Sequence, residues 1–224
     1  LMRSSAASDV YKRQTNKYDE PQAFLRIGVA VKGECMIMPL ANNEFNDYIL
    51  RPINLNSVDG AAFKDATANG AKVKLADVVD FSDWRQEHFV TSNYANVWYF
   101  GFYGIQNVLV STDLSKVKTN MSQTSADKFV PVQEVSPSMK LSYTPGTNHS
   151  WQWVKDNCNS MAESTQANYD EIKELLGEIT YDNNRTPVRK AFTLRFPVTV
   201  IYDWGEFTEY IDVLVKPVLS LIHI

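Results

Sequence analysis

The sequence predicts an all-β protein, an antiparallel β-sandwich with one short helix. The first observation behind this prediction is a long hairpin near the C-terminus, in which apolar and polar residues alternate. The second is a series of further segments rich in β-branched and aromatic residues, with turn residues between them. The third is a single stretch with helical periodicity, which we expect to lie over one end of a sheet.

The C-terminal hairpin is formed by residues 192–202 and 207–215, where one face of each strand is apolar. Gly205 supplies the backbone freedom that a tight turn between antiparallel strands requires. Pro197 has no backbone N–H to donate, so we expect it to face a sheet edge or a bulge. Further strands are expected in the segments ILRPINL (49–55), AKVKLADVVDF (71–81), WYFGFYGIQNVLVST (98–112), FVPVQEV (129–135), MKLSYTP (139–145) and GEITY (177–181).

The segment NYDEIKELLGEI at 168–179 has apolar residues at helical spacing and predicts the single helix. Asn168 is suited to cap its N-terminus, and Glu171 follows three residues later, as in a capping box. Gly177 can end the helix because glycine readily adopts the left-handed conformation found after a last helical turn.

The C-terminal hairpin has an earlier counterpart. AFLRIGVAV at 23–31 and EFNDYILRP at 44–52 repeat the pattern of AFTLRFPVTV and EFTEYIDVLVKP. A repeat of about 165 residues is the simplest explanation of this similarity. We therefore expect residues 15–52 to be the C-terminal hairpin of a preceding repeat, and residues 53–217 to form one complete β-sandwich repeat.

The two ends of the chain differ in character from the rest. LMRSSAASDVYKRQ at 1–14 and LSLIHI at 219–224 resemble translated adapter read-through from the sequencing of environmental DNA. We treat residues 1–14 and 218–224 as non-native or disordered tails, and expect the chain to be a fragment of a longer protein.

Composition disfavours several classes of partner. The 22 basic and 26 acidic residues give a net charge of −4, which repels nucleic-acid phosphates and anionic membrane surfaces. The apolar runs are too short to predict a membrane-spanning helix. Cys35 and Cys158 are far apart in the sequence and lack the spacing of metal ligands. A disulfide between them is one interpretation. The favoured interpretation is that each cysteine is a small buried apolar residue.

The sequence contains no motif for phosphate binding, zinc binding or nucleophilic catalysis, so we expect neither an enzyme nor a cofactor or metal site. His88 and His149 have polar neighbours and are read as surface or turn residues. Asp77, Asp80 and Asp83 could converge on a calcium ion, but they lack the spacing of an EF-hand, and a role in turns is favoured.

The aromatic segment YANVWYFGFY at 94–103 permits two interpretations. As a strand, it would direct aromatic side chains to both faces, so packing in the core or against a neighbouring repeat is favoured. The alternative is an exposed platform that stacks on sugar rings, as in carbohydrate-binding modules. The candidate ligand-binding residues of such a platform are Trp98, Tyr99, Tyr103, Trp151 and Trp153.

AFTLRFPVTVIYDWGEF, YDNNRTPV and YFGFYG together resemble the tandem Ig-like repeats of large surface proteins and lipoproteins from gut bacteria of the Bacteroidota type. The resemblance covers most of residues 20–217. It implies an Ig-like antiparallel β-sandwich, a secreted or cell-surface location, and a non-catalytic role as spacer, adhesin or scaffold.

The leading hypothesis is a non-catalytic structural or adhesive repeat module of a bacterial extracellular or cell-surface protein. Its expected partners are neighbouring repeats of the same chain, and a glycan or a surface protein of the host. Pro52 and Pro217 at equivalent joints would stiffen the junctions between repeats, because proline fixes one backbone dihedral. Two alternatives stay open: a carbohydrate-binding module that uses the exposed aromatics, and an Ig-like decoration protein of a phage virion.

Overall fold

A computed structural model gives the structure of the chain, which divides into two compact units: residues 1–54 with 83–87, and residues 55–82 with 88–224. The second unit contains nearly everything that the structure describes. The expected hairpin of a preceding repeat, both tails, Cys35 and His88 lie outside the described residues. The described residues are 53–67, 70–83, 94, 97–182, 184, 188–202 and 205–217.

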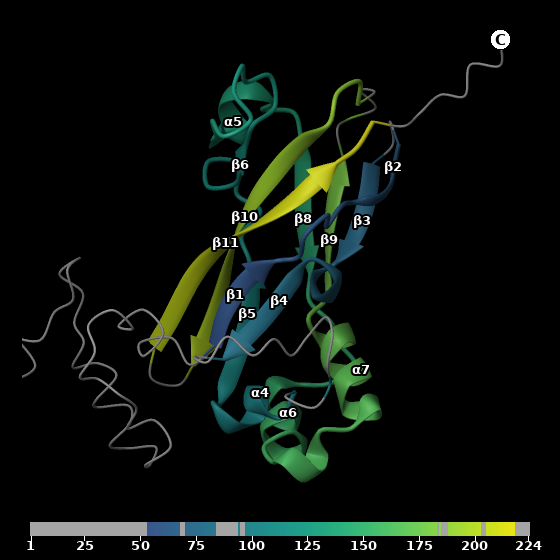
Figure 1. Cartoon of the computed structure of the whole chain (residues 1–224), viewed down its shortest axis with the longest axis vertical. Helices are drawn as coiled ribbons and strands as arrows, with labels where there is room; N and C mark the ends of the chain where they lie inside the picture. The colour runs from purple at the N-terminus through teal and green to yellow at the C-terminus, as the bar shows by residue number, and fades with distance from the viewer. Residues whose placement is uncertain are drawn as a thin grey trace, which may run out of the picture. The chain divides into compact units, whose positions relative to one another are not determined.

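Strands make up most of the regular structure, and the helices are short. The strands are β1 (Ile53–Ser57), β2 (Lys64–Thr67), β3 (Gly70–Lys74), β4 (Val79–Asp83), β5 (Ile105–Val110), β6 (Lys118–Thr119), β7 (Val130–Pro131), β8 (Lys140–Thr144), β9 (Glu178–Asp182), β10 (Phe192–Tyr202) and β11 (Gly205–Val215). The helices are α4 (Tyr99–Phe102), α5 (Val132–Val135), α6 (Trp151–Asn157) and α7 (Gln166–Leu175), with 3-10 turns at Leu75–Asp77 and Met161–Glu163. These short helices lie at the ends of the sheets, with α4, α6 and α7 at one end and α5 at the other (Figure 1).

The strands form antiparallel sheets, as the sequence predicts. One sheet has the order β11-β10-β6-β7, and β5 also pairs with β10. A second sheet has the order β2-β3-β9-β8, and β1 pairs with β4 in a two-stranded sheet. The described part of the chain is thus predominantly antiparallel β structure.

The long C-terminal hairpin is confirmed. β10 and β11 pair without interruption from Phe192 opposite Val215 to Tyr202 opposite Gly205. The alternate residues Phe192, Leu194 and Phe196 are buried, because this face of the strand packs against the core. The alternation of apolar and polar residues in the sequence therefore indicates a sheet with one buried face.

Pro197 does not lie on an edge strand, because β10 has neighbours on both sides. On the side away from β11, β5 ends opposite Val198 and β6 begins opposite Arg195. The carbonyl of Pro197 accepts a hydrogen bond from the backbone N–H of Ser111 on this same side. The missing N–H of proline therefore falls at the junction between two successive partner strands, where it interrupts no ladder.

The two larger sheets share a core. The ring of Phe63 lies 5.5 Å from that of Tyr181 on β9 and 6.4 Å from that of Phe196 on β10. All three side chains are at most 4% exposed. Aromatic rings from both sheets therefore meet in one apolar interior.

The expectation of a single helix is wrong, and three expected strands need correction. The aromatic segment 98–103 forms helix α4, with β5 beginning only at Ile105. The segment 129–135 is a two-residue strand followed by helix α5. A 3-10 turn at Leu75–Asp77 divides the segment 71–81 into β3 and β4.

Helix α7 is confirmed in type and in its C-terminal end. Gly177 follows the last turn with φ +75°, the left-handed conformation that glycine favours. The N-terminus lies earlier than predicted, because Thr165 and not Asn168 is the capping residue. The Thr165 hydroxyl accepts a hydrogen bond from the backbone N–H of Asn168 at 3.2 Å.

Candidate functional site

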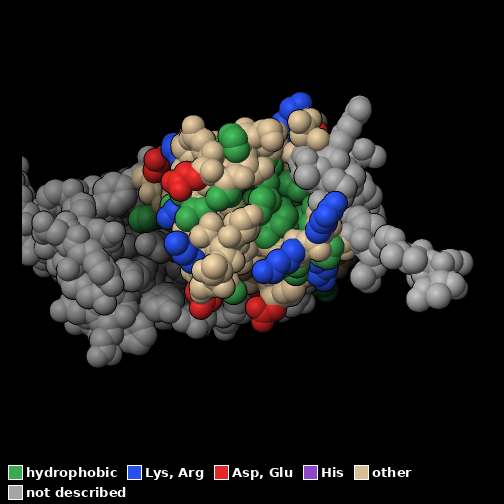
Figure 2. Space-filling view, turned by 90° about the horizontal axis from the view of Figure 1, so that it is seen from above, with side chains coloured by type: hydrophobic (Ala, Val, Ile, Leu, Met, Phe, Trp, Pro, Cys, Tyr) green, Lys and Arg blue, Asp and Glu red, His purple; other side chains and the backbone are tan. Residues whose placement is uncertain are grey.

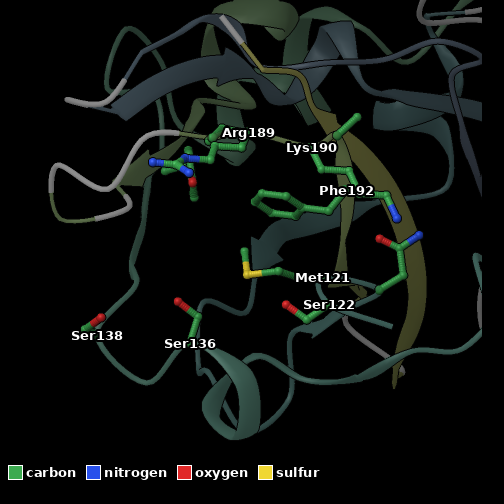
Figure 3. A pocket seen from close by; sticks show the side chains of 11 residues that line it. Met121, Ser122, Ser136, Ser138, Arg189, Lys190 and Phe192 are labelled. Carbon is green, nitrogen blue, oxygen red and sulfur yellow. The ribbon is translucent and has the colours of Figure 1, made fainter. Parts of the chain in front are cut away.

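A cavity of about 280 Å³ opens at the start of β10 (Figure 3). Three separate segments enclose it: residues 120–122 after β6, residues 136–138 after α5, and residues 188–192 leading into β10. Tyr181 of β9 completes the lining. Figure 2, which looks onto the end of the domain where α5 lies, shows apolar surface with Lys and Arg side chains beside it.

The interior of the cavity is apolar. Tyr181 is fully buried, and its ring lies 6.2 Å from that of Phe192, which is 7% exposed. Met121 is half-buried. Figure 3 shows the Phe192 ring and the Met121 thioether directed toward the middle of the cavity. These side chains offer an apolar contact surface to a small molecule.

Arg189 and Lys190 supply positive charge at the rim. Both side chains are exposed, and no carboxylate belongs to those lining residues that the structure describes. The other described arginine, Arg195, donates from its Nε and Nη2 atoms to the two carboxylate oxygens of Asp212, at 2.7 and 2.8 Å. Arg189 makes no such ion pair within the described part of the chain, and its side chain is exposed at the rim.

The loop 120–122 is held in place by hydrogen bonds to β10. The Asn120 side-chain oxygen accepts from the backbone N–H of Thr193 at 2.7 Å. The Thr119 hydroxyl donates to the Thr193 carbonyl at 2.8 Å and accepts from the Met121 backbone N–H at 3.0 Å. Ser122 has φ +60°, a conformation that costs energy for a residue other than glycine. The wall of the cavity is therefore preformed.

The aromatic residues predicted as a binding platform lie elsewhere, and the structure brings several of them together. Trp98 stacks on Tyr99 with ring centroids 4.2 Å apart, and Tyr99 on Tyr103 at 5.4 Å. Tyr99 is 8% exposed and Tyr103 is 7% exposed, so both rings lie in the interior. Trp98 is half-buried.

Trp151 and Trp153 lie on helix α6 and not on a strand. The ring of Trp151 lies near helix α4, with its centroid 6.3 Å from that of Phe100. Trp153 instead stacks on His149, with centroids 3.8 Å apart and planes within 6°. The five predicted residues therefore do not form one continuous platform.

His149 belongs to a small polar cluster that the sequence did not reveal. Its Nε2 atom lies 3.1 Å from a carboxylate oxygen of Glu171 on α7. The same oxygen accepts a hydrogen bond from the Asn148 side-chain amide at 2.7 Å. These contacts tie the loop before α6 to α7.

The remaining candidates that the structure describes are not brought together into a chemical site. Cys158 is a free, fully buried thiol, and burial raises its pKa to about 11. In the ranges that the structure describes, no three His, Cys, Asp or Glu side chains are placed to hold a metal ion. Asp77 lies in the 3-10 turn, whereas Asp80 and Asp83 belong to β4.

Comparison with known proteins found no matching family model, no matching curated protein and no matching solved structure. Within the described residues, none of the helices is both long and apolar enough to span a bilayer.

Proposed function

We propose that residues 53–217 form a non-catalytic structural and adhesive module, an Ig-like β-sandwich repeat of an extracellular or cell-surface protein. The observation that carries this proposal is the path of the chain at its two ends. The segment that opens the second unit runs alongside β11, the strand that closes it. The extracellular setting rests on the resemblance to tandem surface repeats described above.

Two contacts join the beginning of this leading segment, residues 55–63, to the middle of β11. The backbone N–H of Leu55 donates to the Glu209 carboxylate at 3.0 Å. The Ser57 hydroxyl accepts from the backbone N–H of Asp212 at 2.8 Å.

Two further hydrogen bonds join the end of the leading segment to the end of β11. The Leu214 N–H donates to the Ala61 carbonyl at 2.9 Å, and the Phe63 N–H donates to the Leu214 carbonyl at 3.0 Å. Ala62 and Leu214 form a parallel bridge. The two segments therefore run in the same direction along their whole contact.

This parallel arrangement determines how the module would respond to tension. The leading segment begins near Glu209, and β11 ends beyond Leu214, so the two chain ends leave the contact in opposite directions. A force on both ends then loads the connecting hydrogen bonds together instead of opening them one after another. Resistance to forced unfolding depends on the unfolding rate, which such a contact lowers. This property suits a spacer that transmits load between repeats.

The shared core supports the sandwich component of the proposal. Phe63 contacts rings from both larger sheets, and it follows directly on the parallel bridge to β11. Tension at the chain ends would therefore be transmitted into the packed interior. Pro217, which follows β11, restricts the backbone where the chain would continue into a next repeat.

Single-molecule stretching with handles on both chain ends tests the proposal. Leu214→Pro removes the N–H that bonds Ala61 and spares the β10 ladder, because this N–H points away from β10. Ser57→Ala removes the acceptor of the Asp212 N–H. Loss of one hydrogen bond, about 1 kcal/mol, should raise the unfolding rate at constant force about fivefold.

The matched control is Ser142→Ala, the same change at an exposed serine on β8 that is outside this contact. It should leave the unfolding rate under force unchanged. The proposal is wrong if Ser57→Ala and Leu214→Pro unfold under force at the wild-type rate, or if Ser142→Ala has an equal effect.

A further inference from the structure

We propose that the cavity at the start of β10 binds a carboxylated monosaccharide, such as a hexuronic acid unit of an acidic glycan. This inference goes beyond the load-bearing role proposed above and does not depend on it. It rests on the charge, the hydrogen-bonding groups, the size and the rigidity of the cavity.

The positive charge at the rim of the cavity favours a ligand with an anionic group. The protein carries a net charge of −4, yet the described residues that line the cavity include Arg189 and Lys190 and no acidic residue. A guanidinium group can bind a carboxylate through two parallel hydrogen bonds, as Arg195 does with Asp212 in this same domain. Arg189 is therefore the expected carboxylate ligand, with Lys190 adding a second positive charge.

Hydroxyl groups select a sugar rather than a simple anion. Ser122, Ser136 and Ser138 line the cavity, and their hydroxyls make no hydrogen bond within the described residues. Each hydroxyl can both donate to and accept from a sugar hydroxyl. Figure 3 shows Arg189 on one side of the Phe192 ring and Ser136 on the other. A ligand spanning the cavity would thus meet a cation at one end and hydroxyls at the other.

Size and shape favour a single ring. The volume of about 280 Å³ lies just below the range of about 300–1,000 Å³ for small-molecule sites. Phe192 and Met121 offer apolar contact to the C–H groups of such a ring. The hydrogen bonds that hold Asn120 and Thr119 against Thr193 fix this wall in advance, which reduces the entropy lost on binding.

An NMR titration of the full chain with D-galacturonic acid tests the site, with D-galactose as the uncharged counterpart. Binding should shift the amide signals of residues 120–122, 136–138 and 188–192, and galactose should bind at least tenfold more weakly. Arg189→Gln should weaken galacturonate binding at least about tenfold, equivalent to 1.4 kcal/mol. Arg189→Lys should retain part of the affinity, since it keeps the charge but loses the fork geometry.

Lys155→Gln is the matched control, because it removes an exposed positive charge from helix α6, outside the cavity. Its affinity for galacturonate should equal that of the wild type. Ser136→Ala should weaken galacturonate binding but not the response to acetate.

Four outcomes would overturn the proposal. They are equal binding of galactose, an equal response to acetate or inorganic phosphate, an equal loss in Lys155→Gln, and the absence of shifts around the cavity. An equal response to acetate or phosphate would show that the cavity binds anions without recognising a sugar.

Discussion

Tyr143 links three elements of the domain through one hydroxyl group. The side chain projects from β8, and its oxygen lies 3.1 Å from the Val108 carbonyl of β5 and 2.9 Å from the Leu176 carbonyl after α7. A carbonyl only accepts hydrogen bonds, so the contact requires the protonated phenol. Burial raises the pKa of Tyr143 to about 12, which keeps the group protonated well above neutral pH.

Tyr143→Phe should lower the free energy of unfolding by about 1 kcal/mol at pH 7, because the two carbonyl groups that share the single hydroxyl proton lose this donor. Urea unfolding followed by circular dichroism measures this change. Tyr210→Phe is the control, since Tyr210 is 49% exposed and its hydroxyl makes no hydrogen bond within the described residues. An equal loss in both variants would contradict the role assigned to the Tyr143 hydroxyl.

The stabilising effect of the Tyr143 hydroxyl should also depend on pH, and Tyr143→Phe tests this dependence. The pKa of Tyr143 is raised in the folded state, so its contribution to stability is complete below the ordinary value of 10 and is lost as the pH rises toward 12. Wild type should therefore lose stability over this interval, and the difference between wild type and Tyr143→Phe should shrink. A difference that is constant from pH 8 to 11 would contradict the raised pKa.

At the scale of elements, the contact between helices α4 and α6 depends on a glycine. The Gly101 N–H donates to the Cys158 carbonyl at 3.1 Å, so the two backbones approach closely. A Cβ atom built on Gly101 would lie 2.4 Å from that carbonyl oxygen and 2.7 Å from the carbonyl oxygen of Val154. No side chain fits in this space without movement of the backbone.

Gly101→Ala distinguishes close packing from helix propensity. Propensity alone would stabilise α4, since alanine is favoured over glycine in a helix by about 1 kcal/mol. The steric clash should instead destabilise the protein by about 1–3 kcal/mol. Thermal unfolding measures the sign of the change, and a stabilised variant would contradict the α4–α6 contact.

Gly60→Ala is the control for this substitution, because Gly60 has φ +74° and open space where a Cβ atom would lie. It should report only the backbone strain of a left-handed residue, about 1–2 kcal/mol. It should have no effect on the environment of Cys158, whereas Gly101→Ala should increase the rate at which this buried thiol reacts with a disulfide reagent.

The elements that sequence reasoning identified are those whose pattern is set by one buried face. Alternation identified β10 and β11, and helical spacing with Gly177 identified the end of α7. The prediction of a strand in the aromatic segment 98–103 is wrong. It rested on the average preference of aromatic residues for strands. Here the pairs Trp98–Phe102 and Tyr99–Tyr103 instead pack at helical spacing. Gly101 is the residue in this segment that indicates close helix packing, because it permits the approach of α6.

The candidate cavity could not be predicted from local pattern. Its three segments, at residues 120–122, 136–138 and 188–192, are separated by strands and helices and meet only through the pairing of β6 with β10 and of β6 with β7. Adjacent serines and basic residues are common on surfaces and do not by themselves indicate a site. They indicate a site only because the fold places them around the same cavity as Phe192 and Met121.

At the scale of the whole domain, one interior serves both larger sheets. Phe63 is 4% exposed and contacts Tyr181 of β9 and Phe196 of β10, while its N–H bonds β11 through Leu214. The described strands of the two sheets make no pairing with each other, so side-chain packing must couple them. If this coupling is strong, the domain should unfold as one cooperative unit.

Phe63→Ala tests this coupling, and should lower the free energy of unfolding by about 3–5 kcal/mol, because it leaves a cavity where the sheets meet. Leu109→Ala, at a 40% exposed position on β5, should cost less than about 1 kcal/mol. Urea unfolding is followed by far-ultraviolet circular dichroism for the sheets and by tryptophan fluorescence, to which Trp98, Trp151 and Trp153 of the helical region contribute. The two transitions should coincide in the wild type and shift together in Phe63→Ala, since loss of either sheet removes the packing surface of the other. Two steps in the circular dichroism transition, or a loss in Phe63→Ala no greater than in Leu109→Ala, would show that the sheets are stable independently and that tension at the chain ends does not reach a common core.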